Sequence, residues 1–107
     1  MSGNRKDLES AFQTEVIDKI ERMGGYVLKT HVSSFQKQGE PDVTVCFKGR
    51  YVAFELKVGD NQPTKLQLLR LKEIRRAGGI AMVVRQISQV EETLNEISRH
   101  QHGDESQ

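Results

Sequence analysis

A predicted β-hairpin at the centre of the chain, Val43 to Phe54, constrains the fold more than any other segment. Lys48-Gly49 lies at its midpoint, and a two-residue turn there, with glycine supplying a positive φ, would bring Asp42 opposite Glu55. A longer turn would shift this register. Because side chains alternate along a strand, one face of the hairpin is apolar and the other is more polar. The apolar set is Val43, Val45, Val52, Phe54 and Leu56, and the opposite set is Asp42, Thr44, Cys46, Tyr51, Ala53, Glu55 and Lys57.

Two carboxylates and a lysine therefore share one end of a sheet face. Directly opposed carboxylates such as Asp42 and Glu55 repel each other and destabilise a strand pair. A divalent cation between them relieves this repulsion, and Mg²⁺ binds one or two carboxylates together with waters and substrate phosphate. Hydrolysis of a phosphodiester needs a nucleophile and neutralisation of developing charge, which a metal supplies, and Lys57 adds a compact positive charge. The hairpin thus predicts a metal-dependent nuclease site.

The segment 5–23 is predicted to be a helix, because apolar residues recur at three- and four-residue spacing before Gly24-Gly25 ends it. These apolar residues are Leu8, Phe12, Val16, Ile20 and Met23. At about 100° per residue, Glu9 projects near the centre of this stripe and Gln13 lies at its edge. A carboxylate that faces a core is costly unless it is paired or bound to a metal. Glu9 is therefore either a site residue or, if the helix is rotated slightly, a half-exposed side chain.

The remaining segments predict an α/β fold with the element order αβββαβα, in which helices pack on one mixed sheet. A capping box predicts that a helix begins after Thr64, with Gln67 either completing the box or contributing to the site. A second capping box, Ser88 to Glu91, predicts the start of the last helix. The expected strands are 26–30, 42–47, 50–58 and 80–85, and the expected later helices are 64–77 and 88–99.

The length of 107 residues suits one domain with one core. We expect a single domain over 1–107, with its core at about 5–99 and a flexible tail at 100–107. No apolar run approaches the length of a membrane span, and no apolar segment of a signal peptide follows the first charged residues. The single cysteine, Cys46, lies in an apolar β-branched run, so we expect a buried thiol and a cytoplasmic protein.

Positive charge is concentrated in the helix predicted at 64–77, although the net charge is only +1. Its basic side chains form either a solvated helix face or a surface for phosphates beside the carboxylates. The DNA-binding candidates are Lys37, Lys65, Arg70, Lys72, Arg75 and Arg76. Leucines on more than one face of the same helix favour a homodimer. A zinc site lacks ligands, and nothing places a histidine base against a serine nucleophile.

Several short motifs occur in a characteristic order along the chain. They are Glu9-Ser10-Ala11-Phe12-Gln13, Gly24-Gly25, Gly39-x-Pro41-Asp42, Glu55-Leu56-Lys57, and then Thr64 and Gln67 before an apolar helix. In order and spacing this set resembles the virus-type replication-repair nuclease (VRR-NUC) family of the PD-(D/E)xK nuclease superfamily, in its stand-alone form. The resemblance extends over about residues 7–85 and implies a restriction-endonuclease-like fold.

The resemblance also implies roles for individual residues. Asp42 and Glu55 would coordinate Mg²⁺ or Mn²⁺, with the backbone carbonyl of Leu56 as a further ligand. Lys57 would position the attacking water and steady negative charge. Glu9 would complete the acidic cluster directly or through a water. Three further residues would either support these groups from behind or orient the substrate. They are Gln13, Gln67 and Thr64.

The activity implied by the resemblance is a structure-specific endonuclease that cuts branched DNA. Small stand-alone members resemble Holliday junction resolvases, which act as dimers on four-way junctions, and a bacterial or phage role in recombination and repair is implied. Two alternatives stay open. One is a nucleic-acid-binding module of the same fold that does not cleave, and the other is a nuclease that acts on flaps or linear ends. The small number of residues outside the core favours recognition of the DNA backbone over base readout.

Overall fold

The computed structural model describes residues 5–28 and 38–105 and has the predicted order of elements. Within these ranges, three helices and four strands follow one another in the order αβββαβα. Their bounds are α1 (Arg5–Arg22), β1 (Tyr26–Val27), β2 (Val43–Phe47), β3 (Arg50–Leu56), α2 (Lys65–Arg76), β4 (Ile80–Val84) and α3 (Ile87–Glu105). The first predicted strand is shorter than expected, and its last predicted residues, 29–30, lie outside the described residues.

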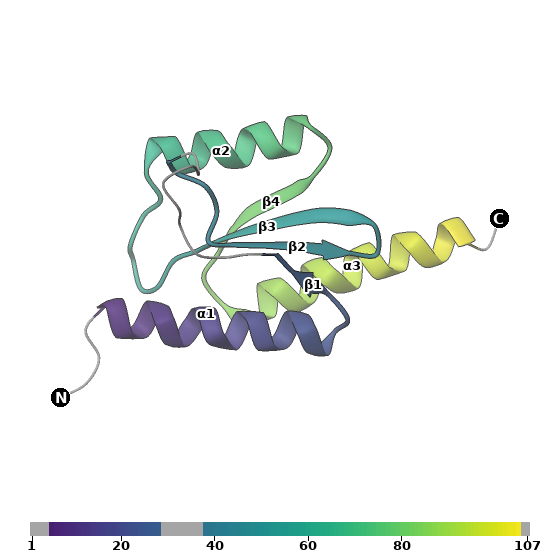
Figure 1. Ribbon diagram of the computed structural model, residues 1–107, viewed down its shortest axis with the longest axis horizontal. Coiled ribbons are helices and arrows are strands. Elements are labelled where there is room, and N and C mark those ends of the chain that lie inside the picture. The colour runs from purple at the N-terminus through teal and green to yellow at the C-terminus, as the bar shows by residue number, and fades with distance from the viewer. Residues whose placement is uncertain (1–4, 29–37, 106–107) are drawn as a thin grey trace.

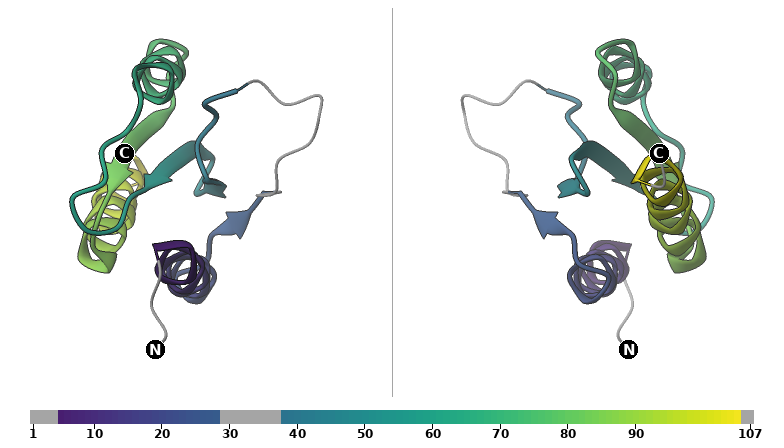
Figure 2. Two further views of the ribbon diagram at one scale, coloured as in Figure 1. Left: turned by 90° about the vertical axis from the view of Figure 1, so that its left-hand side faces the viewer. Right: turned by 90° about the vertical axis from the view of Figure 1, so that its right-hand side faces the viewer.

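One mixed sheet in the order β1-β2-β3-β4 forms the centre of the molecule (Figure 1). The β1–β2 and β2–β3 pairs are antiparallel, whereas β3 and β4 are parallel because α2 connects them as a crossover. Helices α1 and α3 cover one face of the sheet, and α2 lies on the other face (Figure 2). This α/β architecture agrees with the fold predicted from the sequence.

The main core lies between the sheet and the helices α1 and α3. The apolar face of the hairpin packs there against buried residues of both helices, including Val16 and Ile20 of α1 and Val90 and Leu94 of α3. A smaller cluster, Ala53, Leu71 and Ala81, joins α2 to strands β3 and β4 on the opposite face. Burial on both faces holds β3 firmly, and β3 is the strand that ends at the predicted carboxylate site.

The hairpin has the predicted register and the predicted two-residue turn. Phe47 pairs with Arg50, and the ladder continues to the pair Val43 and Phe54. Both turn residues have positive φ, 50° at Lys48 and 79° at Gly49, as a type I′ turn requires. The apolar face is buried as predicted.

The prediction of a buried thiol at Cys46 is wrong, because this side chain is exposed. Cys46 pairs with Tyr26 of β1 and Tyr51 of β3, and both tyrosines are also exposed. Helix α2 packs on β3 and β4 and leaves this part of the sheet face uncovered. An apolar run therefore did not indicate burial on both faces of β2.

The predicted start of the last helix is also wrong. Helix α3 begins at Ile87, before the proposed Ser88 box, and the side chain of Gln89 caps it. Gln89 Oε1 accepts hydrogen bonds from the backbone N–H groups of Arg85 (2.6 Å) and Gln86 (3.0 Å). Glu91 instead forms an ion pair of 2.7 Å with Lys19 of α1.

Helix α3 continues to Glu105, whereas the sequence predicted an end near Arg99 and a flexible tail from 100. The prediction ended the helix where apolar residues cease, but backbone hydrogen bonds can extend a formed helix without them. Glu96 also interacts with Arg99 and His100, one turn further along. Within residues 5–28 and 38–105, no helix has the length and apolar character needed to cross a membrane.

Candidate active site

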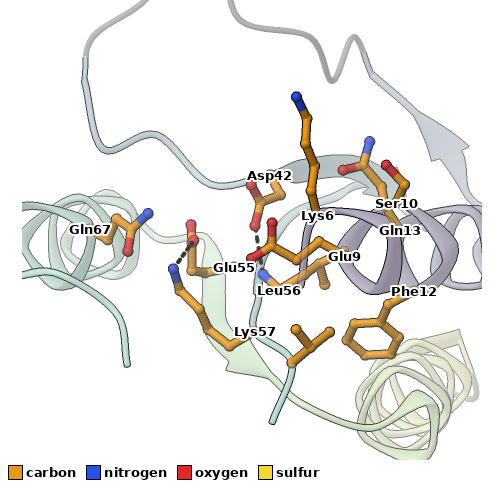
Figure 3. Close-up of a pocket in the computed structure, with 11 residues that line it drawn as sticks. Lys6, Glu9, Ser10, Phe12, Gln13, Asp42, Glu55, Leu56, Lys57 and Gln67 are labelled. Carbon is orange, nitrogen blue, oxygen red and sulfur yellow. Dashed lines mark hydrogen bonds and ion pairs between the residues drawn. The ribbon is translucent and has the colours of Figure 1, made fainter. Parts of the chain in front are cut away.

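A polar pocket lies at the end of the hairpin that is remote from its turn (Figure 3). Helix α1 forms one wall, the ends of the hairpin form another, and the first turn of α2 contributes Gln67. The cavity has a volume of about 390 Å³. It is lined by Lys6, Glu9, Ser10, Phe12, Gln13, Asp42, Glu55, Leu56, Lys57, Val58 and Gln67.

Asp42 lies directly before β2, in the position opposite Glu55 that the register predicts. Its Oδ2 accepts a hydrogen bond of 2.8 Å from the backbone N–H of Leu56. Burial raises the pKa of the Asp42 carboxyl, and the hydrogen bond from Leu56 opposes this rise. The hydrogen bond therefore fixes the carboxylate at the junction of the two strands.

The approach to Asp42 is held in place by α2. Gly39 has φ +83°, and a Cβ on it would lie 2.8 Å from Leu66 Cγ, so a larger residue would collide with α2. Arg70 Nε donates a 2.9 Å hydrogen bond to the carbonyl of Gln38 and lies 3.6 Å from Glu40 Oε2. The positive φ of Gly39 and the close approach of Leu66 explain why the motif before Asp42 contains a glycine.

Glu55 is the most unusual group in the pocket. Its side chain is 1% exposed, and Oε1 is buried with no hydrogen-bond partner among the described residues. Its other oxygen, Oε2, lies 3.5 Å from Lys57 Nζ. Burial, followed by the nearby charge of Asp42, raises the pKa of the Glu55 carboxyl to about 8. A buried carboxylate oxygen without a partner is costly, so the site favours the binding of a cation there.

Lys57 follows β3 directly and is 8% exposed. Its backbone N–H donates a 3.0 Å hydrogen bond to the carbonyl of Val84, which extends the β3–β4 pairing to this residue. The ammonium group is thereby held beside Glu55 and faces the pocket (Figure 3). The strand pairing therefore positions the charge and limits its movement.

The donor set of the pocket fits a hard divalent cation. Asp42 and Glu55 offer two carboxylates with one oxygen unsatisfied, and Mg²⁺ is commonly held by one or two carboxylates plus waters and phosphate. No group of three or more histidine, cysteine, aspartate or glutamate side chains within the described ranges is arranged to share one metal. Glu9 therefore lines the same pocket without forming a third direct ligand in this arrangement.

Glu9 and Gln13 face the pocket from α1 and are partly buried, so Glu9 lies in neither the apolar core nor open solvent. Leu8, which was expected in the buried stripe, is 51% exposed. The first turns of α1 thus present their polar residues to the pocket. The sequence patterns did not indicate Lys6 and Ser10 as site residues, although their spacing from Glu9 and Gln13 places all four on neighbouring positions of one helix face.

The predicted capping-box role of Gln67 is confirmed, and its predicted role at the site stays a prediction. Its backbone N–H donates to Thr64 Oγ1 at 3.0 Å, and its Oε1 accepts from the Thr64 N–H at 2.9 Å, which completes the predicted capping box. The same side chain lines the pocket. Because Oε1 is occupied by the cap, the amide is held in one orientation and Nε2 is the group left to donate toward a ligand. Thr64 acts as the cap and does not line the pocket.

Searches of sequence families and of curated proteins find no match for this chain. Among solved structures, a VRR-NUC domain is similar, with a TM-score of 0.67, 25% sequence identity, and coverage of 81% of this chain and 94% of that chain. The chain is therefore similar in structure to VRR-NUC domains.

Two further structures share this fold. A second VRR-NUC domain protein matches with a TM-score of 0.66 and 21% identity, over 92% of this chain and 89% of that chain. The Holliday junction resolvase Hjc of Archaeoglobus fulgidus matches with a TM-score of 0.56 and 18% identity, over 71% of this chain and 65% of that chain. The restriction-endonuclease-like fold expected from the motifs is therefore confirmed.

Five of the predicted DNA-binding residues lie in the described part of the chain. They fall into two groups, and none of the five lines the pocket. Arg70 and Arg75 are bonded within the protein, Arg70 as described above and Arg75 through a 2.7 Å hydrogen bond to the carbonyl of Ala81. Exposed on α2 are Lys65, Lys72 and Arg76. Lys37 lies outside the described residues.

Proposed function

We propose that this protein is a Mg²⁺- or Mn²⁺-dependent endonuclease that hydrolyses phosphodiester bonds in branched DNA. The observation that carries the proposal is the buried, unsatisfied Oε1 of Glu55 beside Asp42 and Lys57. The structural similarity to VRR-NUC domains and to a resolvase supports a nuclease of this superfamily. The dependence on a metal and the choice of branched DNA as substrate are the parts of the proposal that go beyond this similarity.

Asp42 and Glu55 would hold the metal, together with the backbone carbonyl of Leu56, and Glu9 would act on it through a water. When bound, the metal lowers the pKa of water and neutralises charge on the phosphate. Asp42 contributes a carboxylate held by the Leu56 N–H, and Glu55 contributes an oxygen that no group in the described part of the chain satisfies. Both carboxylates are thus oriented before a ligand arrives.

Lys57 would steady negative charge on the phosphate and orient the attacking water. Its ammonium is nearly buried, so its interaction with a phosphate oxygen is less screened than at the surface. Gln67 would donate through Nε2 to a phosphate oxygen, since the capping box already occupies its Oε1. Gln13 would orient the substrate from the α1 wall.

The proposed substrate is a four-way junction, and the proposed active form is a homodimer. The similarity to a Holliday junction resolvase supports the junction. Leu68 and Leu69 of α2 are 47% and 44% exposed, which supports an apolar contact with a second copy. We place the enzyme in the cytoplasm of a bacterium or of a phage host, acting in recombination and repair, on the basis of the family resemblance alone.

A cleavage assay tests this proposal. Wild-type protein is incubated with a four-way junction, a 5′ flap and a linear duplex, in Mg²⁺, in Mn²⁺ and in EDTA. We expect paired symmetric nicks on the junction that need a metal and are lost in Glu55→Ala. The matched control is Glu21→Ala, at an exposed position on α1 outside the pocket, which should cleave like the wild type.

The other outcomes separate the parts of the proposal. Cleavage of only the flap or the linear duplex would retain the chemistry and overturn the junction substrate. Cleavage in EDTA, or full activity of Glu55→Ala, would overturn the metal site. Tight junction binding without cleavage in either metal would establish a binding module in place of an enzyme.

A further inference from the structure

The α1 wall of the pocket carries a cation that has no role in the chemistry proposed above. Lys6 and Ser10 are four residues apart on α1 and both line the cavity, so they are neighbours on one helix face. Both side chains are exposed. Each can donate hydrogen bonds, and Lys6 is positively charged.

Lys6 and Lys57 differ in the contacts that their ammonium groups make within the protein. Lys57 is nearly buried and lies 3.5 Å from Glu55, so its charge is committed to the centre of the pocket. Within the described residues, Lys6 has no ion pair or hydrogen bond. In Figure 3, the side chains of Lys6 and Lys57 come from different walls of the pocket and point in different directions.

The charge of the pocket indicates that Lys6 can bind a phosphate group. Three carboxylates and two lysines line the cavity, so its formal charge is +1 when the proposed divalent metal is bound. A nucleic acid strand carries one negative charge per nucleotide, so a strand that reaches the carboxylates brings further phosphates to the walls of the pocket. The cavity volume of about 390 Å³ leaves room for a group of a bound strand beside the scissile phosphate.

We propose that Lys6 and Ser10 form a second phosphate subsite, which binds the phosphodiester group next to the one that is cut. This inference rests on the proposed nuclease function and assigns α1 to substrate binding. The subsite would anchor the strand while the scissile phosphate lies at the Asp42 and Glu55 end. Because the contact is made to bound substrate and not to the reacting atoms, it acts mainly on KM.

The test combines a variant of the protein with a modified DNA. The scissile phosphate is first mapped with wild-type protein on the DNA that it cuts. A neutral methylphosphonate then replaces each flanking phosphate in turn. For wild type, we expect one of these replacements to raise KM by about threefold to fivefold, the size of an exposed ion pair.

Lys6→Gln should raise KM on unmodified DNA by the same factor, with kcat changed less than twofold, and should lower the slope of binding against salt by about one. On the methylphosphonate DNA the variant should show no additional loss. Lys6→Arg should restore KM on natural DNA. The control Lys48→Gln, which removes an exposed lysine at the hairpin turn and outside the pocket, should respond to the methylphosphonate like the wild type.

The subsite would be overturned if the increases in KM from Lys6→Gln and from every flanking methylphosphonate were additive. It would also be overturned if Lys6→Gln left KM unchanged. Either result would leave the nuclease proposal intact. Absence of any cleavage by wild type would overturn the nuclease proposal, and the subsite with it. Lys6 is exposed, so thermal unfolding of the variant should match wild type and exclude a folding defect.

Discussion

The two walls of the pocket carry similar residue types in opposite environments. On the sheet wall, Glu55 and Lys57 are almost completely buried, and the Glu55 carboxyl has a strongly raised pKa. On the helix wall, Glu9 is partly buried and Lys6 is exposed. The sheet wall is therefore rigid and electrostatically strained, whereas the helix wall can adjust to what binds.

The difference arises from the backbone. Strand β3 is paired on both sides, with β2 and with β4, so Glu55 cannot move its carboxylate into water without breaking the sheet. A side chain on the first turns of α1 can rotate toward solvent at little cost. Charges held by paired strands therefore reduce the stability of the free protein, while charges on the helix do not.

The largest expected effect tests this strain on the sheet wall. In EDTA, Glu55→Gln should unfold at a higher temperature than wild type at pH 9, by an amount equivalent to about 3–5 kcal/mol, since each pKa unit corresponds to about 1.4 kcal/mol. The folded-state pKa of about 8 lies above the ordinary value of 4.5. The contribution of the Glu55 carboxyl to stability is thus fully present below pH 4.5 and is lost as the pH rises to about 8.

Thermal unfolding of both proteins from pH 4 to 9 measures this difference. The two curves should converge near pH 4, where Glu55 is protonated in the folded and unfolded states. Glu21→Gln, at an exposed position on α1, serves as the control and should follow wild type at every pH. Parallel curves for Glu55→Gln and wild type would show that Glu55 is not strained.

The next effect concerns catalysis on the same wall. Lys57→Met keeps the apolar stem and removes the ammonium, so kcat should fall by about 100-fold or more, the typical effect of removing one preorganised charge-stabilising donor. Single-turnover cleavage rates measure this loss, with Lys48→Met, at the exposed hairpin turn, as the matched surface control. A loss below tenfold would show that Lys57 serves only to neutralise Glu55.

The smallest effect in this series is expected on the helix wall. Glu9→Gln should lower cleavage by about tenfold and raise the metal concentration for half-maximal activity, as expected for a group that acts through a water. Titration of Mg²⁺ and Mn²⁺ against cleavage rate provides the measurement. If Glu9→Gln is as inactive as Glu55→Ala, Glu9 binds the metal directly and the two walls are equivalent.

The hairpin and the carboxylate pair could be predicted because they depend on local rules. The two-residue turn sets the register, and the alternation of side chains then places Asp42 opposite Glu55. The Thr64 capping box was predictable for the same reason, since its hydrogen bonds connect residues three apart. Each of these features needs only a short segment of chain.

The errors concern features that distant segments decide. The exposure of Cys46 depends on where α2 lies across the sheet, and the exposure of Leu8 depends on where α1 lies over the core. The start of α3 was misplaced because two overlapping caps were possible, and Gln89 formed the one that begins earlier. Local sequence patterns do not contain this information.

The sequence by itself determined the order of elements, the hairpin register and the pairing of Asp42 with Glu55, because turn geometry and strand alternation act over a few residues. Only the tertiary structure decided that Glu55 would be buried with one oxygen unsatisfied, because that burial requires β2, β4 and the flanking helices together. The same packing brought Glu9, Lys6 and Gln67 to one pocket from helices far apart in the chain.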